Sequence, residues 1–255
     1  MIYEKLPVVL LSTLASEKKD TTNALIAGYV LTHQEEVAAM GIKELASACH
    51  VGLGSISRFV REIGLRDFSE LKQILRTSLS SFVIPDTDAY ALEYAARVSD
   101  AVKKAAASLD LRKTELLCDD LHSYGKICTY GMLKGISAAV DLQTDMLMMG
   151  KLVHTSVAYG DQMEEIMTAG KDTLIIIFSY TGSYFEYRDF REKEKHLALP
   201  KIWMVCGTKK PVPWFVDEVL TFASDLDLDS HPYQLETAAH LIVETYARKY
   251  RKGSF

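Results

Sequence analysis

Long apolar runs are missing from this chain of 255 residues. No stretch reaches the roughly 18 consecutive apolar residues that make a helix a candidate to cross a bilayer. The N-terminal stretch contains a short apolar patch, but it lacks the basic start and the small-residue cleavage site of a secretory signal peptide. We therefore expect a cytoplasmic protein with no membrane partner.

Closely spaced cysteines are missing as well. The four cysteines stand at positions 49, 118, 128 and 206, and no two of them form a CxxC pair. This scatter favours buried free thiols over disulfides or a metal site. The chain also has neither the HExxH motif of zinc hydrolases nor the GxSxG motif of serine hydrolases. We expect no cofactor, no metal and no catalytic residue.

A net positive charge is the third absence, because 29 Lys and Arg stand against 34 Asp and Glu, a formal charge of -5. Overall charge therefore gives no indication of nucleic-acid binding, which must depend on local placement. Between Leu53 and Thr77 five basic residues stand against three acidic ones. This mild local excess suits a dimer that adds two weak DNA contacts better than a single domain binding alone.

What is present is a helix-turn-helix pattern between Gly41 and Leu71. Apolar residues recur at helical spacing in two short segments, from Ile42 to Ala46 and from Leu53 to Ile63. The interval 49–52 has room only for a tight turn, and Gly64 ends the second segment. In such motifs the second helix enters the major groove. The residues expected to contact DNA are Lys43, Ser55, Ser57, Arg58, Arg61 and Lys72.

The composition, 48% apolar, supports two buried cores. Helices expected at 6–14, 23–31 and 68–79, with a connection at 35–40, make residues 1–80 an all-α helix-turn-helix domain. Pro85 and small polar residues mark a linker at 81–89. Residues 90–255 form the second domain, which opens with an alanine-rich helix at about 90–109.

The second domain alternates apolar strands with helical segments, which predicts an α/β doubly wound parallel sheet. Its clearest strand is the continuous apolar run at 173–179, typical of a central strand. The other expected strands are 126–130, 152–157, 202–206 and 218–222, and the expected helices are 136–149, 163–169, 184–197 and 233–250.

Two loops follow strands of this sheet at the edge where open α/β sheets bind ligands. The loop 179–183 combines hydroxyls with a glycine and is expected to open a helix, whose free amides favour an anion. The loop 131–135 is expected to form the facing wall, with Lys134 adding a positive charge. The residues expected to bind an effector are Gly131, Met132, Lys134, Gly135, Ser179, Thr181, Gly182, Ser183 and Tyr184.

The first domain resembles the N-terminal domain of the RpiR family of bacterial transcriptional regulators. The matching strings are Ile42-x-Glu44-Leu45-Ala46, Ser55-Ile56-Ser57-Arg58-Phe59 and Gly64-Leu65-x-x-Phe68-x-Glu70-Leu71-Lys72. Residues 109–248 resemble the flavodoxin-like SIS (sugar isomerase) domain that follows in that family, through Gly131, Ala139, Asp141, Gly150, Asp172, Ser179, Gly182 and Glu186. The resemblance implies a regulator of carbohydrate genes, a homodimer or homotetramer that binds double-stranded operator DNA and a sugar-phosphate effector.

Several hydroxyls that face phosphate in that family are replaced here. Leu133 and Gly135 stand where the first loop has a glycine and then a serine, and Tyr184 stands where the second loop has a threonine. Each lost hydrogen bond to a charged group is worth about 1.5–3 kcal/mol. Three alternatives stay open: Ser183 and Lys134 compensate, the ligand differs, or the domain only oligomerises. A phosphosugar isomerase with an accessory helical domain is the rival function.

Overall fold

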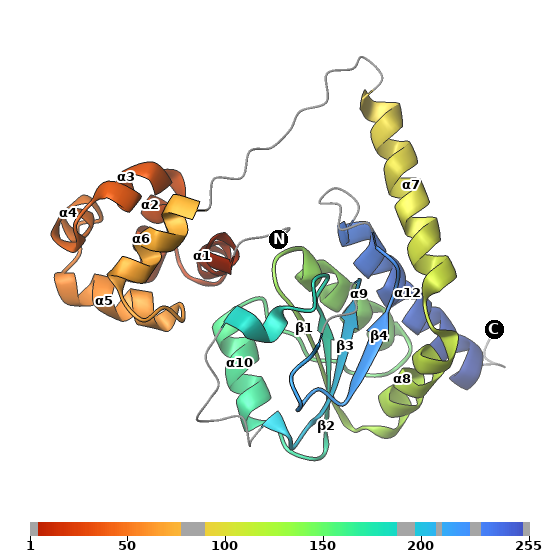
Figure 1. Ribbon diagram of the computed structural model, residues 1–255. Helices are drawn as coiled ribbons and strands as arrows, with labels where there is room; N and C mark the ends of the chain where they lie inside the picture. The colour runs from red at the N-terminus through yellow and green to blue at the C-terminus, as the bar shows by residue number, and fades with distance from the viewer. Residues whose placement is uncertain (1–4, 78–89, 188–196, 208–210, 225–230, 252–255) are drawn as a thin grey trace. The chain divides into compact units, whose positions relative to one another are not determined.

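The structure is a computed structural model that describes residues 5–77, 90–187, 197–207, 211–224 and 231–251 (Figure 1). The chain divides into a helical unit and an α/β unit, and each is described by itself. The expected linker at 81–89 lies outside the described residues. None of the described helices is long and apolar enough to cross a membrane.

The helical unit contains six helices among its described residues: α1 (Lys5–Ser16), α2 (Thr22–Thr32), α3 (Gln34–Ala39), α4 (Ile42–Ala48), α5 (Leu53–Glu62) and α6 (Phe68–Thr77). Thr21 caps α2, where its side chain accepts a hydrogen bond from the N–H of Ala24. The expected connection at 35–40 is instead the short helix α3. Buried apolar side chains from all six helices, including Leu10, Val30, Val37, Leu45, Phe59 and Leu71, form one core.

The turn between α4 and α5 closes through a left-handed residue. His50 has φ 54°, its N–H donates to the carbonyl of Ser47, and the N–H of Val51 donates to the carbonyl of Ala46. This pair of bonds is the Schellman ending of a helix, a place usually taken by glycine. Gly52 is extended and begins α5 as its N-cap. The turn expected at 49–52 is therefore confirmed.

The α/β unit has a sheet of four described parallel strands in the order β1 (Lys126–Gly131), β2 (Thr173–Phe178), β3 (Lys201–Cys206) and β4 (Glu218–Thr221). Its helices are α7 (Tyr90–Ser108), α8 (Leu111–Ser123), α9 (Lys134–Met148), α10 (Tyr159–Thr168) and α12 (His231–Tyr250). The doubly wound α/β fold expected from the sequence is confirmed. Helix α8 was not expected; Asp110 caps it by accepting from the N–H of Lys113.

Each face of the sheet has its own core. Leu174, Ile176 and Phe178 of β2 face α7, α8, α9 and α12, whereas Ile175 and Ile177 face α10. Figure 1 shows α10 on one side of the sheet and α8 and α12 on the other. All six residues of β2 are buried, which explains its continuous apolar sequence.

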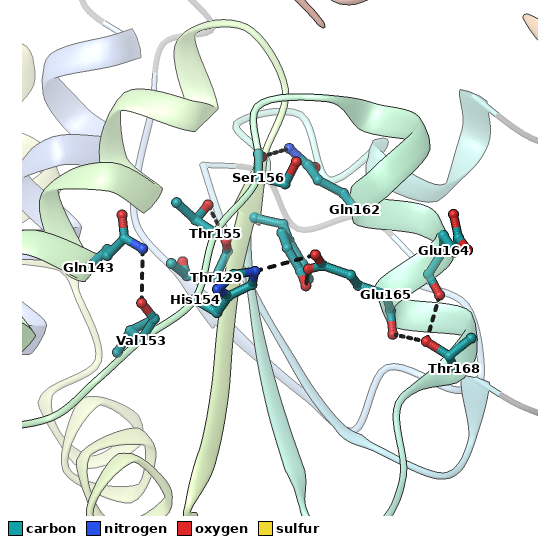
Figure 2. Close-up of polar contacts among 11 residues, drawn as sticks. Thr129, Gln143, Val153, His154, Thr155, Ser156, Gln162, Glu164, Glu165 and Thr168 are labelled. Carbon is teal, nitrogen blue, oxygen red and sulfur yellow. Dashed lines mark hydrogen bonds and ion pairs between the residues drawn. The ribbon is translucent and has the colours of Figure 1, made fainter.

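The prediction of a strand at 152–157 is wrong, because the structure forms only one bridge in this segment, between His154 and Cys128. A longer ladder would pair the carbonyl of Thr129 with the N–H of Ser156. Instead that carbonyl accepts from the hydroxyl of Thr155 at 2.6 Å, and the carbonyl of Ser156 accepts from Nε2 of Gln162 at 2.6 Å (Figure 2). Side chains therefore replace the next ladder bonds.

The bridge still fixes the topology of the sheet. It places the segment around His154 beside β1, on the side away from β2. The chain therefore extends the sheet from β1 in one direction and then crosses back to add β2 on the other side of β1. The direction of strand addition thus reverses between β1 and β2, as in flavodoxin-like sheets. The loops that follow these two strands meet at the switch point.

At the start of the helix expected at 184–197, the structure forms a tighter turn. The described part is a 3-10 helix, η1 (Tyr184–Tyr187), and residues 188–196 lie outside the described residues. Tyr184 and Phe185 are both buried, and their rings pack edge to face with centroids 5.1 Å apart.

Candidate DNA-reading helix and effector loops

Helix α5 has a buried face and a polar exposed face. Ile56, Phe59 and Val60 are fully buried in the core of the helical unit. Arg58 and Arg61 are exposed, and Ser55 and Ser57 are half-buried. The apolar periodicity that anchors α5 therefore directs both arginines outward. An exposed face with two guanidinium groups and small hydroxyl side chains suits contact with phosphates and base edges.

The two lysines expected to contact DNA have different surroundings. Lys43 is exposed on α4. The Lys72 ammonium instead donates to the carbonyls of Met40, at 2.7 Å, and Ala39, at 3.4 Å. Arg76 donates to the carbonyl of Ala38 at 3.1 Å. These carbonyls lie at the end of α3, where a helix has unpaired acceptors and a partial negative charge, so both cations stabilise that end.

In the α/β unit, two glycines let the first loop pack against the sheet. A Cβ at Gly131 would lie 2.4 Å from the backbone of Gly135, and a Cβ at Gly135 would lie 2.6 Å from the carbonyl oxygen of Phe178. Only glycine allows these approaches. The first turn of α9 therefore sits directly on the ends of β1 and β2, which brings the loops 131–135 and 179–183 together.

The second loop is a closed turn. The N–H of Gly182 donates to the carbonyl of Ser179 at 2.8 Å, and Gly182 has φ 70°. The loop is tied to β3, because the N–H of Ser179 donates to the carbonyl of Val205 at 3.0 Å. Ser179, Thr181 and Ser183 are half-buried, as is Met132 in the facing loop, where Lys134 is exposed. The three hydroxyls therefore lie on one tight turn at the switch point.

A buried tyrosine–glutamine pair lies at the end of this loop. Tyr184 is 1% exposed, and its hydroxyl donates to Oε1 of Gln162 at 2.6 Å. Nε2 of Gln162 donates in turn to the carbonyl of Gly131 at 2.9 Å. Burial raises the pKa of Tyr184 well above its usual value, so the hydroxyl keeps its proton. The structure thus places Tyr184 in the core below the loop, where its hydroxyl is committed to Gln162.

A second pair lies at the start of the loop, on the opposite face of the sheet. Tyr180 is buried, and its hydroxyl donates to Oε1 of Gln234 at 2.8 Å. Gln234 is fully buried on α12, and its Nε2 donates to the carbonyl of Ala101 on α7 at 2.9 Å. The sequence did not indicate that Gln162 or Gln234 belongs to the core, because a glutamine within a helical pattern carries no signal of burial.

A further polar cluster lies beside the bridge at His154. Nε2 of His154 is 3.4 Å from Oε1 of Glu165, and the hydroxyl of Tyr130 donates to the other carboxylate oxygen (Figure 2). His154 is bridged to the middle of β1 rather than to its carboxyl end. The cluster therefore ties α10 to the edge of the sheet, and we assign it a structural role.

In the described part of the chain, no group of three or more His, Cys, Asp or Glu could hold a metal ion. The four cysteines are buried with free thiols. Burial raises the pKa of Cys118 to about 12, so this thiol stays protonated and unreactive at neutral pH.

Comparison with known proteins agrees with both halves of the molecule. The model of the helix-turn-helix domain of the rpiR family matches residues 10–82. A curated relative, an uncharacterised HTH-type transcriptional regulator of Caldanaerobacter subterraneus subsp. tengcongensis, is 28% identical over 216 residues, which cover 80% of this chain and 76% of the relative.

Two solved structures share the fold. The Vibrio vulnificus NanR protein complexed with ManNAc-6P aligns with a TM-score of 0.54 and 16% identity, covering 97% of this chain and 93% of that one. The sugar isomerase domain of an RpiR transcription factor from Sphaerobacter thermophilus aligns with a TM-score of 0.54 and 14% identity, covering 65% and 93%. Residues 10–82 therefore match the helix-turn-helix domain of the rpiR family, and the α/β domain that follows has the fold of the sugar isomerase domain of an RpiR transcription factor.

Proposed function

We propose that this protein is a transcriptional regulator of carbohydrate metabolism genes, which binds operator DNA through α5 and a sugar-phosphate effector at the switch point of its α/β unit. The observation that carries the proposal is the division of α5 into a buried apolar face and an exposed face with Arg58 and Arg61. That division is what a recognition helix requires, because one face must hold the helix while the other reaches the groove.

The DNA contacts follow from the position of each side chain on the motif. Arg58 reaches a base or a phosphate, Arg61 reaches the backbone, and Ser55 and Ser57 lie near phosphates or base edges. Lys43 adds an exposed positive charge on the preceding helix. One such domain binds weakly, so tight binding requires two domains on a palindromic operator.

The effector site consists of the turn with Ser179, Thr181, Gly182 and Ser183 facing the loop 131–135. The tight approach of Gly131 and Gly135 supports it, since these glycines bring the first turn of α9 against the end of β2. Helix α9 is 15 residues long, and the positive end of its dipole favours an anion there. The relative in complex with ManNAc-6P has the same fold, which supports a phosphosugar as the ligand class.

Self-association through the α/β unit completes the proposal. Met146 is fully buried, but Leu147, Met148 and Leu152 are 59%, 80% and 76% exposed. Leu147 and Met148 lie in the last turn of α9, and Leu152 follows four residues after its end; such exposed apolar side chains are costly to leave in water. We therefore assign them to the contact between two copies, and sedimentation of the full chain at micromolar concentration tests that contact.

The experiment that tests the regulator is genomic footprinting with the purified full chain, followed by calorimetric titration of a sugar-phosphate panel that includes ManNAc-6P. The expected result is one palindromic site beside catabolic genes and one panel member that changes DNA affinity. A coupled isomerase assay on the same panel separates the rival function: turnover without DNA binding would favour an isomerase. DNA binding with no anionic ligand at millimolar concentration would favour an α/β unit that only oligomerises.

A further inference from the structure

The α/β unit contains a continuous polar connection between the effector loop and the helix that follows the first unit in the chain. Its members are the loop residue Tyr180, the α12 residue Gln234 and the backbone carbonyl of Ala101 on α7. The two hydrogen bonds measure 2.8 Å and 2.9 Å. Tyr180 and Gln234 are 6% and 0% exposed, so neither bond competes with water.

The same tyrosine is held on its other sides. Its backbone carbonyl accepts from the N–H of Gly207 at 3.0 Å, and its ring lies 4.7 Å from the ring of His231 at the start of α12. Tyr180 is also flanked by Ser179 and Thr181, two of the three hydroxyl residues of the loop. A shift of this loop upon binding an anion must therefore move Tyr180 or strain its bond to Gln234.

Helix α7 is suited to respond, because few of its residues are buried. Ala101 and Ala105 are its buried residues, and Tyr90 and Leu92 near its start are 63% and 78% exposed. Gln234 contacts α7 at the buried residue Ala101. Nearer the start of α7, the hydroxyl of Tyr94 lies 3.1 Å from the hydroxyl of Tyr233 on α12. Helix α7 is the first described element after the helical unit, and it packs against α12 within its own unit.

We propose that Tyr180 and Gln234 are positioning residues that couple effector binding at the loop 179–183 to the position of α7, and through α7 to DNA affinity. This inference rests on the proposed function and adds the route by which the effector acts. The pair at the other end of the loop, Tyr184 and Gln162, has the same chemistry but reaches the carbonyls of Gly131 and Ser156 instead of α7. It provides a matched control.

The test compares Tyr180→Phe with Tyr184→Phe in the full chain. Each change removes one buried hydroxyl and leaves one glutamine oxygen without its donor, so both should lower stability to a similar extent. Operator affinity is measured by fluorescence anisotropy without and with ManNAc-6P, or with whichever panel member binds the wild type. The ratio of the two affinities is the coupling factor, which is typically 5- to 150-fold for an effector.

We expect Tyr180→Phe to reduce the coupling factor about fivefold, a change within the range of one buried hydrogen bond, while Tyr184→Phe keeps the wild-type factor. Hydrogen exchange of the α7 amides should respond to the ligand in the wild type and in Tyr184→Phe, and should not respond in Tyr180→Phe. A purely structural role would change stability in both variants and the coupling in neither.

Three results would overturn the inference. If Tyr180→Phe keeps the full coupling factor, the connection does not carry the signal, although the regulator itself stands. If both variants lose coupling equally, the loop acts through general rigidity and not through α7. If no panel member binds the wild type, or if a bound ligand leaves operator affinity unchanged, the inference fails together with the proposed regulation, and the binding isotherm identifies the step that failed.

Discussion

The hydroxyl of Tyr184 donates to Oε1 of Gln162 across 2.6 Å, inside the core between the sheet and α10. The sequence predicts that Tyr184 binds the effector, and the structure places its hydroxyl against this buried glutamine. Because the same glutamine also donates to the carbonyl of Gly131, the two loops at the switch point share one buried side chain. The two loops are therefore held together from inside the core by this glutamine.

Replacing Tyr184 with phenylalanine should lower the free energy of unfolding by about 1–3 kcal/mol, because Oε1 of Gln162 would remain buried without a donor. Effector affinity should fall less in Tyr184→Phe than in a double variant with Ser179→Ala and Thr181→Ala, which loses two hydroxyls of the loop itself. Urea denaturation and calorimetry measure the two quantities. An equal loss of affinity in both variants would show that Tyr184 contacts the ligand directly.

Gly135→Ala should damage both stability and effector binding. The added Cβ would lie 2.6 Å from the carbonyl oxygen of Phe178, a backbone atom that cannot rotate away. Overpacking of this kind costs about 1–3 kcal/mol and would separate the two loops. Gly160→Ala is the control, since nothing lies within 4 Å of a Cβ at Gly160 in α10. Equal midpoints of thermal denaturation for Gly135→Ala and Gly160→Ala would contradict the close approach of Gly135 to the carbonyl of Phe178.

Arg58→Ala should weaken operator binding by roughly 1–3 kcal/mol and relax specificity at one base pair if the guanidinium contacts guanine. Arg66→Ala is the matched control: this arginine is also exposed in the same unit, but it lies beyond α5 and pairs with Glu70 at 3.3 Å. We expect near wild-type binding from Arg66→Ala. Anisotropy titrations on wild-type and single-substituted operators would detect the difference, and circular dichroism verifies the fold. Wild-type affinity in Arg58→Ala would remove Arg58 from the interface.

Lys72→Met should lower the stability of the helical unit by about 1 kcal/mol, because the ammonium donates to carbonyls at the end of α3. It should leave the salt dependence of DNA binding unchanged. Lys43→Met should do the reverse, with unchanged stability and a salt slope smaller by about one unit. Chemical denaturation and titrations at several salt concentrations separate the two roles. A reduced slope in Lys72→Met would return this lysine to the DNA interface.

Local patterns in the sequence determined the helix-turn-helix and the alternating α/β domain. The apolar spacing of α5 and the continuous apolar run of β2 report burial directly, since each residue's neighbours along the chain set which face it occupies. The turn at 49–52 follows from the same short-range geometry. These features depend on residues that lie within a few positions of each other.

Contacts between distant residues were decided only by the tertiary structure. Tyr180 and Gln234 are 54 residues apart, and Lys72 reaches carbonyls more than 30 residues earlier in the chain. The strand expected around His154 ends after one bridge because the Thr155 and Gln162 side chains take the next ladder positions. A glutamine or lysine has the same local propensity whether it is buried against a carbonyl or exposed to water. Its partner, and therefore its role, exists only once the elements have packed.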